Sequence, residues 1–300
     1  MGKVLVLLDA YAILHRAFHA LPSFTSSRTG EPTGALYGFA AFLLKTIREL
    51  KPDYLVACYD LAEPTFRHAA YEQYKAKRPK PDDLLITQIN RSRDIIKGFN
   101  IPICDASGFE ADDVLGTIVE NLKSQTSNIK IIVASGDLDT LQLVKDDNVV
   151  VYTLSKGIKE TVIYNEKKVY ERFGFGPELV PDFKALKGDP SDNIIGVRGI
   201  GEKTAIDLIK NFGSIENLYK TLKENPEKLK EAGIKERVIK LLEENEEEAM
   251  FSKTLAEIRK DAPIKFSLEG SKWRENFDIE KIKSLFTELG FKSLIERLPS

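Results

Sequence analysis

The sequence has few residues that could form disulfides or a thiolate metal site. Its 300 residues include 2 cysteines, Cys58 and Cys104, which lie in apolar stretches without a C-x-x-C spacing. This is typical of buried, reduced thiols in a cytosolic protein and disfavours a structural disulfide. The 3 histidines, His15, His19 and His68, have no ligand spacing with a cysteine, which disfavours a Cys-His zinc site.

Long apolar runs are also absent. The first run, from Val4 to Leu8, is too short for a signal peptide or a membrane span and is followed by Asp9. We expect a cytoplasmic protein that is not associated with a membrane. A hydrophobic content of 42% is sufficient for a folded core, whereas the net charge of -2 neither favours nor excludes a nucleic-acid partner.

Three apolar runs, each followed by an aspartate, predict buried parallel strands. They are residues 4–8 before Asp9, 54–59 before Asp60 and 129–134 before Asp137. Segments with helical periodicity lie between them, at 35–50, 83–99 and 111–123. This alternation predicts an α/β domain with a parallel sheet, in which ligands bind beyond the carboxyl ends of the strands. The three aspartates are therefore expected to meet at one edge of the sheet.

The second half of the chain has a different pattern. From about Asn165 the strand signals stop, and short helices are predicted at 178–186, 203–211 and 235–258. We therefore expect a catalytic α/β domain over residues 1–164 and a helical lobe over residues 165–300.

Acidic residues concentrate near the predicted ends of strands and helices. Nine of them stand out: Asp9, Asp60, Glu110, Asp112, Asp113, Asp137, Asp139, Asp189 and Asp192. Carboxylates packed into one crevice repel one another and raise their own pKa values unless cations neutralise them. Oxygen ligands suit Mg²⁺ or Mn²⁺, and two cations about 3.5 to 4 Å apart are a known arrangement for phosphodiester hydrolysis.

Some of these patterns have other interpretations. Each acid at a helix N-terminus offsets the helix dipole by roughly 0.3 to 1 kcal/mol, which alone could account for Glu110 and Asp112. Residues 137–140 superficially match the DxDxT signature of phosphatases that use an aspartyl-phosphate nucleophile, but that interpretation leaves Asp9 and Asp60 unexplained. The His15 and His19 spacing, four residues, suits a metal or phosphate contact on a helix as well as ordinary packing.

Two further segments have the composition of nucleic-acid contacts. Residues 64–80 interleave aromatic side chains with five lysines and arginines, which suits single-stranded nucleic acid as well as an exposed amphipathic helix. Residues 196–205 place three glycines before a predicted helix start near Lys203, without the G-x-G-x-x-G spacing of dinucleotide sites. They serve a tight turn between helices, and we expect them also to let the backbone approach a phosphate, with Lys203 and Thr204 adding contacts.

Taken together, the motifs resemble the flap endonuclease family, and within it the 5′-nuclease domains of bacterial DNA polymerase I, from Val4 to about Leu298. The segments that carry the resemblance are 16–18 (RAF), 37–39 (YGF), 65–68 (TFRH), 74–75 (YK), 110–113 (EADD), 136–137 (GD), Asp139, 188–189 (GD), 191–193 (SDN) and 199–205 (GIGEKTA). The resemblance implies a PIN-like domain with a helical arch at about 61–90 over the active site. It also implies a helix-hairpin-helix at about 183–212 that grips duplex DNA.

The resemblance assigns roles residue by residue. Ligands of the first metal site would be Asp9, Asp60, Glu110 and Asp112, and those of the second Asp113, Asp137, Asp139, Asp189 and Asp192, with the division between Asp112 and Asp113 left open. Lys75, Arg78 and Arg67 would contact the scissile phosphate or the emerging 5′ strand. Further DNA contacts are assigned to Phe18, Tyr74, Lys77, Gly199, Gly201, Lys203 and Thr204. The family also often binds a potassium ion at the hairpin.

Four positions depart from the family pattern: Ala10, His15, Leu138 and Lys187 stand where glycine, tyrosine, a basic residue and threonine are usual. None removes an expected ligand, so they put substrate affinity in doubt more than the chemistry. We expect a 5′-3′ exonuclease and flap endonuclease that acts on branched or nicked DNA, with a DNA polymerase as a partner in the same or another chain. A catalytically silent junction binder and a PIN-like ribonuclease are the rival hypotheses.

Overall fold

A computed structural model describes residues 2–123, 128–156 and 160–299 of the chain. It contains one sheet of strands β1 (Lys3–Asp9), β2 (Tyr54–Cys58), β3 (Ile103–Cys104), β4 (Ile129–Ser135), β5 (Val149–Lys156) and β6 (Glu160–Tyr164). The strand order is β3-β2-β1-β4-β5-β6, and only β6 runs antiparallel to its neighbour. The α/β fold with a parallel sheet is confirmed. β1 lies in the middle and pairs with β2 on one side and β4 on the other, so the carboxyl ends of these three strands are adjacent.

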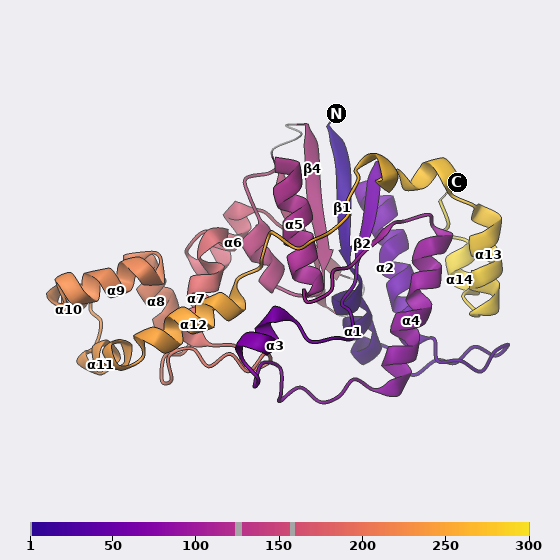
Figure 1. Ribbon diagram of the computed structural model, residues 1–300. Helices are drawn as coiled ribbons and strands as arrows, with labels where there is room; N and C mark the ends of the chain where they lie inside the picture. Colours follow the sequence, from indigo (N-terminus) through magenta and orange to yellow (C-terminus); the bar gives the residue numbers. More distant parts are fainter. Residues whose placement is uncertain (1, 124–127, 157–159, 300) are drawn as a thin grey trace.

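Helices cover both faces of this sheet (Figure 1). The alternation of side chains along β1 sends Val6 and Leu8 toward α1 (Ala10–Ala20), α2 (Gly34–Leu50) and α4 (Asp83–Gly98). Leu5 and Leu7 point to the other face, where α5 (Ala111–Lys123) packs. None of the helices in the described part of the chain is long and apolar enough to cross a membrane.

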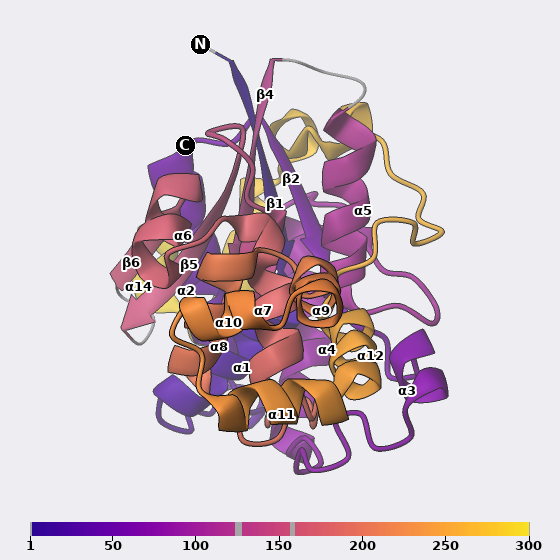
Figure 2. The same cartoon turned by 90° about the vertical axis from the view of Figure 1, so that its left-hand side faces the viewer.

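A separate helical lobe extends from one end of the α/β core. Figure 2 shows this lobe end-on, in front of the sheet. Its helices are α7 (Val180–Lys187), α8 (Glu202–Phe212), α9 (Ile215–Glu224), α10 (Glu227–Glu231), α11 (Glu236–Glu244) and α12 (Glu246–Ala256). They share a hydrophobic core of their own, and α6 (Glu166–Phe173) links it to β6.

Two expected helices have different bounds in the structure. The helix expected over 235–258 is interrupted at Asn245, whose side-chain amide donates to the Leu241 carbonyl at 2.8 Å and so competes with the helical pattern. The helix expected over 178–186 begins with a 3₁₀ turn, Pro177–Leu179, and becomes α-helical only at Val180, before Pro181.

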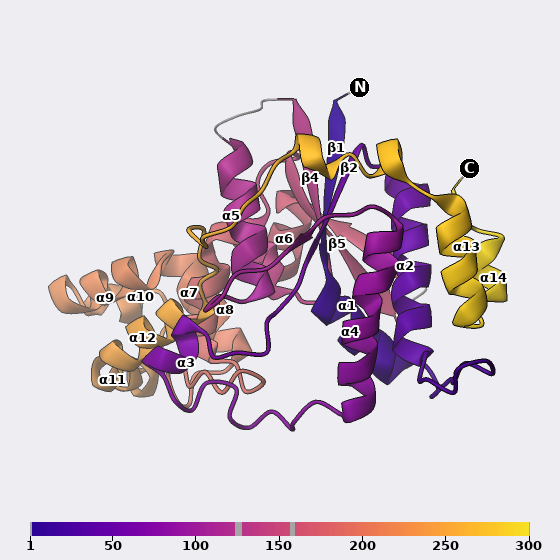
Figure 3. The ribbon, with the colours of Figure 1, turned by 45° about the vertical axis from the view of Figure 1, so that its right-hand side comes forward.

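The arch region is mostly non-helical. Between β2 and the start of α4 at Asp83, the chain forms one helix, α3 (Phe66–Ala70). Residues 71–78 form turns. Figure 3 shows this segment running from the helical lobe past the sheet edge to α4. The chain therefore crosses the sheet edge where the resemblance places an arch, but as a short helix followed by turns.

The last part of the chain does not join the helical lobe. After α12 it crosses back over the α/β core to α13 (Ile279–Glu288) and α14 (Lys292–Ile295), at the opposite end of the molecule (Figure 1). Trp273, Ile282 and Phe286 are fully buried in the same core as α2 and α4. The expectation that residues 165–300 form one lobe therefore does not describe these residues, whose apolar face covers the α/β core instead.

Candidate active site

Asp9 lies at the end of β1 and is also the N-cap of α1. Its carboxylate accepts hydrogen bonds from the Ala12 N–H at 3.0 Å and from the Ser135 hydroxyl at 2.6 Å. Burial, with a smaller contribution from repulsion by Asp60 and Asp137, raises the pKa of Asp9 to about 7 despite these bonds. The three strand ends thus bring their aspartates together, as the sequence predicted.

Asp60 and Asp137 follow β2 and β4. Asp60 accepts from the Ala111 N–H at 2.9 Å, a free donor at the start of α5. Asp137 accepts from the Asp139 N–H at 2.9 Å, while its own N–H donates to the Ser135 hydroxyl at 2.9 Å. Ser135 therefore orients two acids at once, a role that the sequence analysis missed.

Asp112 has the least compensated charge of the cluster. It lies in the first turn of α5, and its carboxylate makes no hydrogen bond or ion pair within the described part of the chain. Burial raises the pKa of Asp112 well above its usual value, and repulsion from Asp9, Asp137, Asp139 and Asp60 adds to this. Because a charge that is partly removed from water and surrounded by like charges is costly unless it is paired, this carboxylate favours either a proton or a cation.

Asp139 and Asp189 share a cation, Lys184, that the sequence analysis also missed. The Lys184 ammonium donates to Asp139 and, at 2.7 Å, to Asp189. Burial raises the pKa of Asp139 to about 7, against the pull of Lys184 and with added repulsion from Asp137. Burial also acts to raise the pKa of Asp189, but Lys184 and Ser191 overcome it and lower that pKa to about 2. Lys184 lies on α7, five residues before Asp189. No sequence motif for metal or substrate binding would have selected this lysine.

Glu110 and Asp192 are held by the arch. The Lys75 ammonium donates to Glu110 at 2.7 Å, and the Arg78 guanidinium donates to Asp192. The Tyr74 hydroxyl lies between these two acids, 3.2 Å from Glu110 and 3.1 Å from Asp192. Lys75 adopts a left-handed backbone conformation, with φ of 55°, and its N–H donates to the Asp192 carbonyl at 2.9 Å.

Tyr74 is therefore not positioned for the DNA contact assigned to it. It is only 3% exposed, and its ring packs edge-on against His68. Burial and the two neighbouring acids raise the pKa of its hydroxyl far above the usual value. Tyr74 supports the arch from inside, whereas Lys77 is exposed and Phe18 is half-buried beside His19.

Asp113 and Arg67 form a buried ion pair, which contradicts both roles assigned to them. The Arg67 guanidinium donates to the two Asp113 oxygens at 2.7 and 2.8 Å, and both side chains are almost inaccessible. Asp113 also accepts from the Glu110 and Arg259 N–H groups, and Arg67 donates to the Leu255 and Glu257 carbonyls. With its oxygens occupied, Asp113 is a structural residue, and Arg67 does not reach the surface.

The donor set fits hard divalent cations. Among residues 2–123, 128–156 and 160–299, no three Asp, Glu, His or Cys side chains are arranged as metal ligands. Four of the acids are paired with cations instead: Glu110 with Lys75, Asp192 with Arg78, and both Asp139 and Asp189 with Lys184. The acids outside these pairs, centred on Asp112, are oxygen donors that lack a neutralising partner. Oxygen-only donors with an excess of negative charge suit Mg²⁺ or Mn²⁺.

The hairpin between α7 and α8 exposes backbone at a helix start. Gly199 has φ of +94°, which favours glycine, and Gly201 is the N-cap of α8 without a side-chain cap. A methyl group at Gly201 would meet no heavy atom within 4 Å. Lys203 is exposed and Thr204 partly so, and both lie in the first turn of α8. The arrangement leaves free N–H groups open to an anion.

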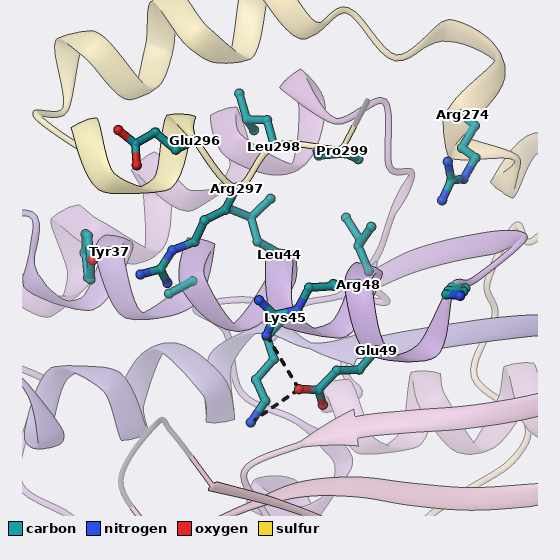
Figure 4. Close-up of a pocket in the computed structure, with 13 residues that line it drawn as sticks. Tyr37, Leu44, Lys45, Arg48, Glu49, Arg274, Glu296, Arg297, Leu298 and Pro299 are labelled. Carbon is teal, nitrogen blue, oxygen red and sulfur yellow. Dashed lines mark ion pairs between the residues drawn. The ribbon is translucent and has the colours of Figure 1, made fainter.

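A cavity of about 960 Å³ lies elsewhere, between α2 and the last residues of the chain. Figure 4 shows Lys45, Arg48 and Arg297 around it, with ion pairs from Lys45 and Arg48 to Glu49. These residues lie toward the end of α2 that precedes β2, at the amino edge of the sheet, whereas the acids lie at the carboxyl edge. The cavity is therefore separate from the acid cluster.

Two models of known protein families match this chain. The model of the 5′-3′ exonuclease N-terminal resolvase-like domain matches residues 4–174, and that of the 5′-3′ exonuclease C-terminal SAM fold matches residues 175–278. The chain belongs to the 5′-3′ exonuclease family. Its relatives include the DNA polymerase I of Caldicellulosiruptor bescii, 41% identical over 98% of this chain, and that of Bacillus subtilis, 38% identical over 99%. The chain spans about a third of the length of these relatives, 33% and 32% respectively.

Solved structures with low sequence identity share the fold. The T5 5′-exonuclease with bound zinc is 19% identical, with a TM-score of 0.68 over 96% of this chain and 99% of that one. The catalytic core of Rad2 in complex with a DNA substrate is 18% identical, with a TM-score of 0.60 over 99% and 93%. The fold of this chain is thus shared by structures of low sequence identity.

Proposed function

We propose that this 5′-3′ exonuclease family member hydrolyses a phosphodiester of DNA near the junction of a single-stranded 5′ end and duplex, as an exonuclease and a flap endonuclease. The products would be a 5′-phosphate and a 3′-hydroxyl. The observation that supports this most is Asp112, a partly buried carboxylate that is repelled by four other aspartates and has no cationic partner among the described residues. Repulsion of this kind is costly to the fold, and substrate-activating cations would relieve it.

Two divalent cations, Mg²⁺ or Mn²⁺, would supply Lewis-acid catalysis when bound. Asp9, Asp60, Glu110 and Asp112 would hold the first, and Asp137, Asp139, Asp189 and Asp192 the second; Asp113 is excluded from this set by its pairing with Arg67. Without metal, the Lys184 ammonium neutralises Asp139 and Asp189. Lys75 and Arg78, which pair with Glu110 and Asp192, would be free to contact the DNA phosphates if cations took over these two acids.

The hairpin and the exposed arch residues would position the substrate. Free N–H groups at Gly201 and the first turn of α8, with Lys203 and Thr204, suit the backbone of the uncut duplex without reading its sequence. A potassium ion at this hairpin is part of the proposal. Lys77 and Phe18 would contact the single-stranded part of the DNA.

The biological setting follows from the same chemistry. Removal of 5′ flaps and primers belongs to DNA replication and repair, so we place the chain in the cytoplasm at the nucleoid. The whole-chain similarity to part of DNA polymerase I supports a polymerase, in the same or another chain, as the partner that supplies the flap.

The test of this proposal is cleavage of a 5′-labelled DNA flap, its plain duplex and a matching RNA flap, each with Mg²⁺ and with EDTA. We expect Mg²⁺-dependent release of a short 5′ product, fastest from the DNA flap. Preference for the RNA flap would favour the PIN-like ribonuclease. Tight binding of the DNA flap without any product would favour the silent junction binder.

A further inference from the structure

Two histidines on α1 have no part in the proposed reaction. His15 and His19 lie one helical turn apart, and their Nε2 atoms are 3.3 Å apart. The ring centroids are 4.5 Å apart and the rings meet edge-on. Both side chains are exposed, and neither ring makes another hydrogen bond within the described residues. The pair therefore presents two adjacent ring nitrogens to solvent.

The separation of the two nitrogen atoms matches a metal chelate. Two Zn–N bonds of about 2.0 to 2.1 Å at a tetrahedral angle place their nitrogen atoms about 3.3 Å apart. Two histidines at positions i and i+4 of a helix lie on one face and can bind zinc together. We infer that His15 and His19 form a two-histidine chelate for a borderline divalent transition metal such as Zn²⁺.

The ligand chemistry separates this site from the acid cluster. Imidazole nitrogen prefers Zn²⁺, Co²⁺ or Cu²⁺, whereas the carboxylates suit Mg²⁺. A neutral imidazole is needed, and burial, His19 and Arg78 all lower the pKa of His15, which favours its neutral form. Without metal, one Nε2–H donates to the other Nε2, and binding of the metal replaces that hydrogen bond. The nearby cation Arg78 is itself paired with Asp192, which limits its repulsion of the metal.

Two protein ligands leave coordination positions open to water or an anion. The site lies beside the arch residue Arg78 and next to Tyr11, whose ring stacks on His15 at a centroid distance of 6.0 Å. A bound ion therefore adds positive charge on α1, close to Arg78. The chelate itself does not depend on whether the chain cuts DNA.

The test is Zn²⁺ binding by calorimetry to the whole chain in excess Mg²⁺, added to compete for the acid cluster, together with NMR of the histidine rings. We expect one Zn²⁺ to bind and the His15 and His19 signals to shift together. His15→Gln and His19→Gln should each weaken binding by roughly tenfold or more, since the loss of mere outer-shell partners already costs about 10- to 100-fold.

The third histidine provides the matched control. His68→Gln should leave Zn²⁺ affinity unchanged, and Asp112→Asn should also retain it, which separates this site from the proposed catalytic cluster. Melting temperatures close to that of the wild type would show that the variants are folded. Equal Zn²⁺ affinity in wild type and both glutamine variants, or shifts confined to His68, would overturn the inference.

Discussion

Asp112 and Asp113 are adjacent in the sequence but have opposite surroundings. One residue turns a helix by about 100°, so neighbours on α5 face different ways. Asp112 faces the other acids, and Asp113 faces Arg67. Sequence reasoning recognised the acidic motif but could not divide it, because the partner of Asp113 comes from α3, 46 residues earlier. Lys184 was missed for a similar reason, since it acts through the fold and not through a motif.

The raised pKa values predict how stability depends on pH when metal is removed. Burial raises the pKa values of Asp9 and Asp139 from 3.8 to about 7, so the folded state binds more protons than the unfolded state between these values. Stability should therefore fall as the pH rises through this window. In EDTA, we expect a higher melting temperature at about pH 5 than at about pH 8. Asp112→Asn should flatten this slope, and an unchanged slope would contradict the mutual repulsion.

Lys75 has a separable role in the proposed reaction. Its ammonium pairs with Glu110 in the absence of metal and would be released to a phosphate when cations bind. We expect Lys75→Ala to slow cleavage at saturating DNA by roughly 100-fold or more, the typical loss for one donor to a developing oxyanion. Stabilisation by Mg²⁺ should remain in thermal melts. The exposed Lys80, on the same segment, serves as the control: Lys80→Ala should cleave at close to the wild-type rate.

At the scale of elements, the strands and helices that deliver the acids were the most predictable part. The observed bounds of β1, β2, β4, α2, α4 and α5 follow the expected ranges closely, because their apolar patterns are long and regular. The arch was not predictable at this level. Its backbone is fixed mainly by tertiary contacts, such as the Arg67–Asp113 pair and the hydrogen bond from Lys75 N–H to Asp192.

The ion pair between Arg67 and Asp113 should anchor the arch to α5. Arg67→Met leaves a buried charge unpaired and should cost about 3–5 kcal/mol in the free energy of unfolding. Asp113→Leu in the same molecule should recover part of that loss. Urea unfolding measures both. The exposed pair of Lys223 and Glu246 is the control, since Lys223→Met should cost no more than about 1 kcal/mol. An equally small effect of Arg67→Met would show that the pair is not structural.

At the scale of the whole molecule, the C-terminal helices pack against the α/β core that the first part of the chain forms. Sequence patterns could identify the late helices as amphipathic but not where they dock, because their partners lie on α2 and α4, far away in the sequence. Trp273 shows the result: its indole N–H donates to the Pro52 carbonyl at 3.1 Å, across 221 positions. The C-terminal segment is thus part of the α/β core that carries the acids.

Trp273 should therefore contribute to the stability of the catalytic core. It is completely buried, and Trp273→Ala should lower the free energy of unfolding by about 3–5 kcal/mol. Circular dichroism during urea unfolding checks this. Tyr170, 61% exposed on α6, is the control, because Tyr170→Ala removes little buried area. A loss below about 1 kcal/mol for Trp273→Ala would mean that the C-terminal segment is not part of the folding unit.

The most direct test of the account compares Asp112→Asn and Asp113→Asn on a 5′-labelled DNA flap with Mg²⁺, at a temperature where both variants are folded. Asp112→Asn, like Asp137→Asn, should nearly abolish cleavage while flap binding persists, because it removes a proposed metal ligand. Asp113→Asn should be less stable but still cut. Cleavage by Asp112→Asn at the wild-type rate would contradict the proposed metal cluster, and equal loss of cleavage in both variants would contradict the separation of their roles.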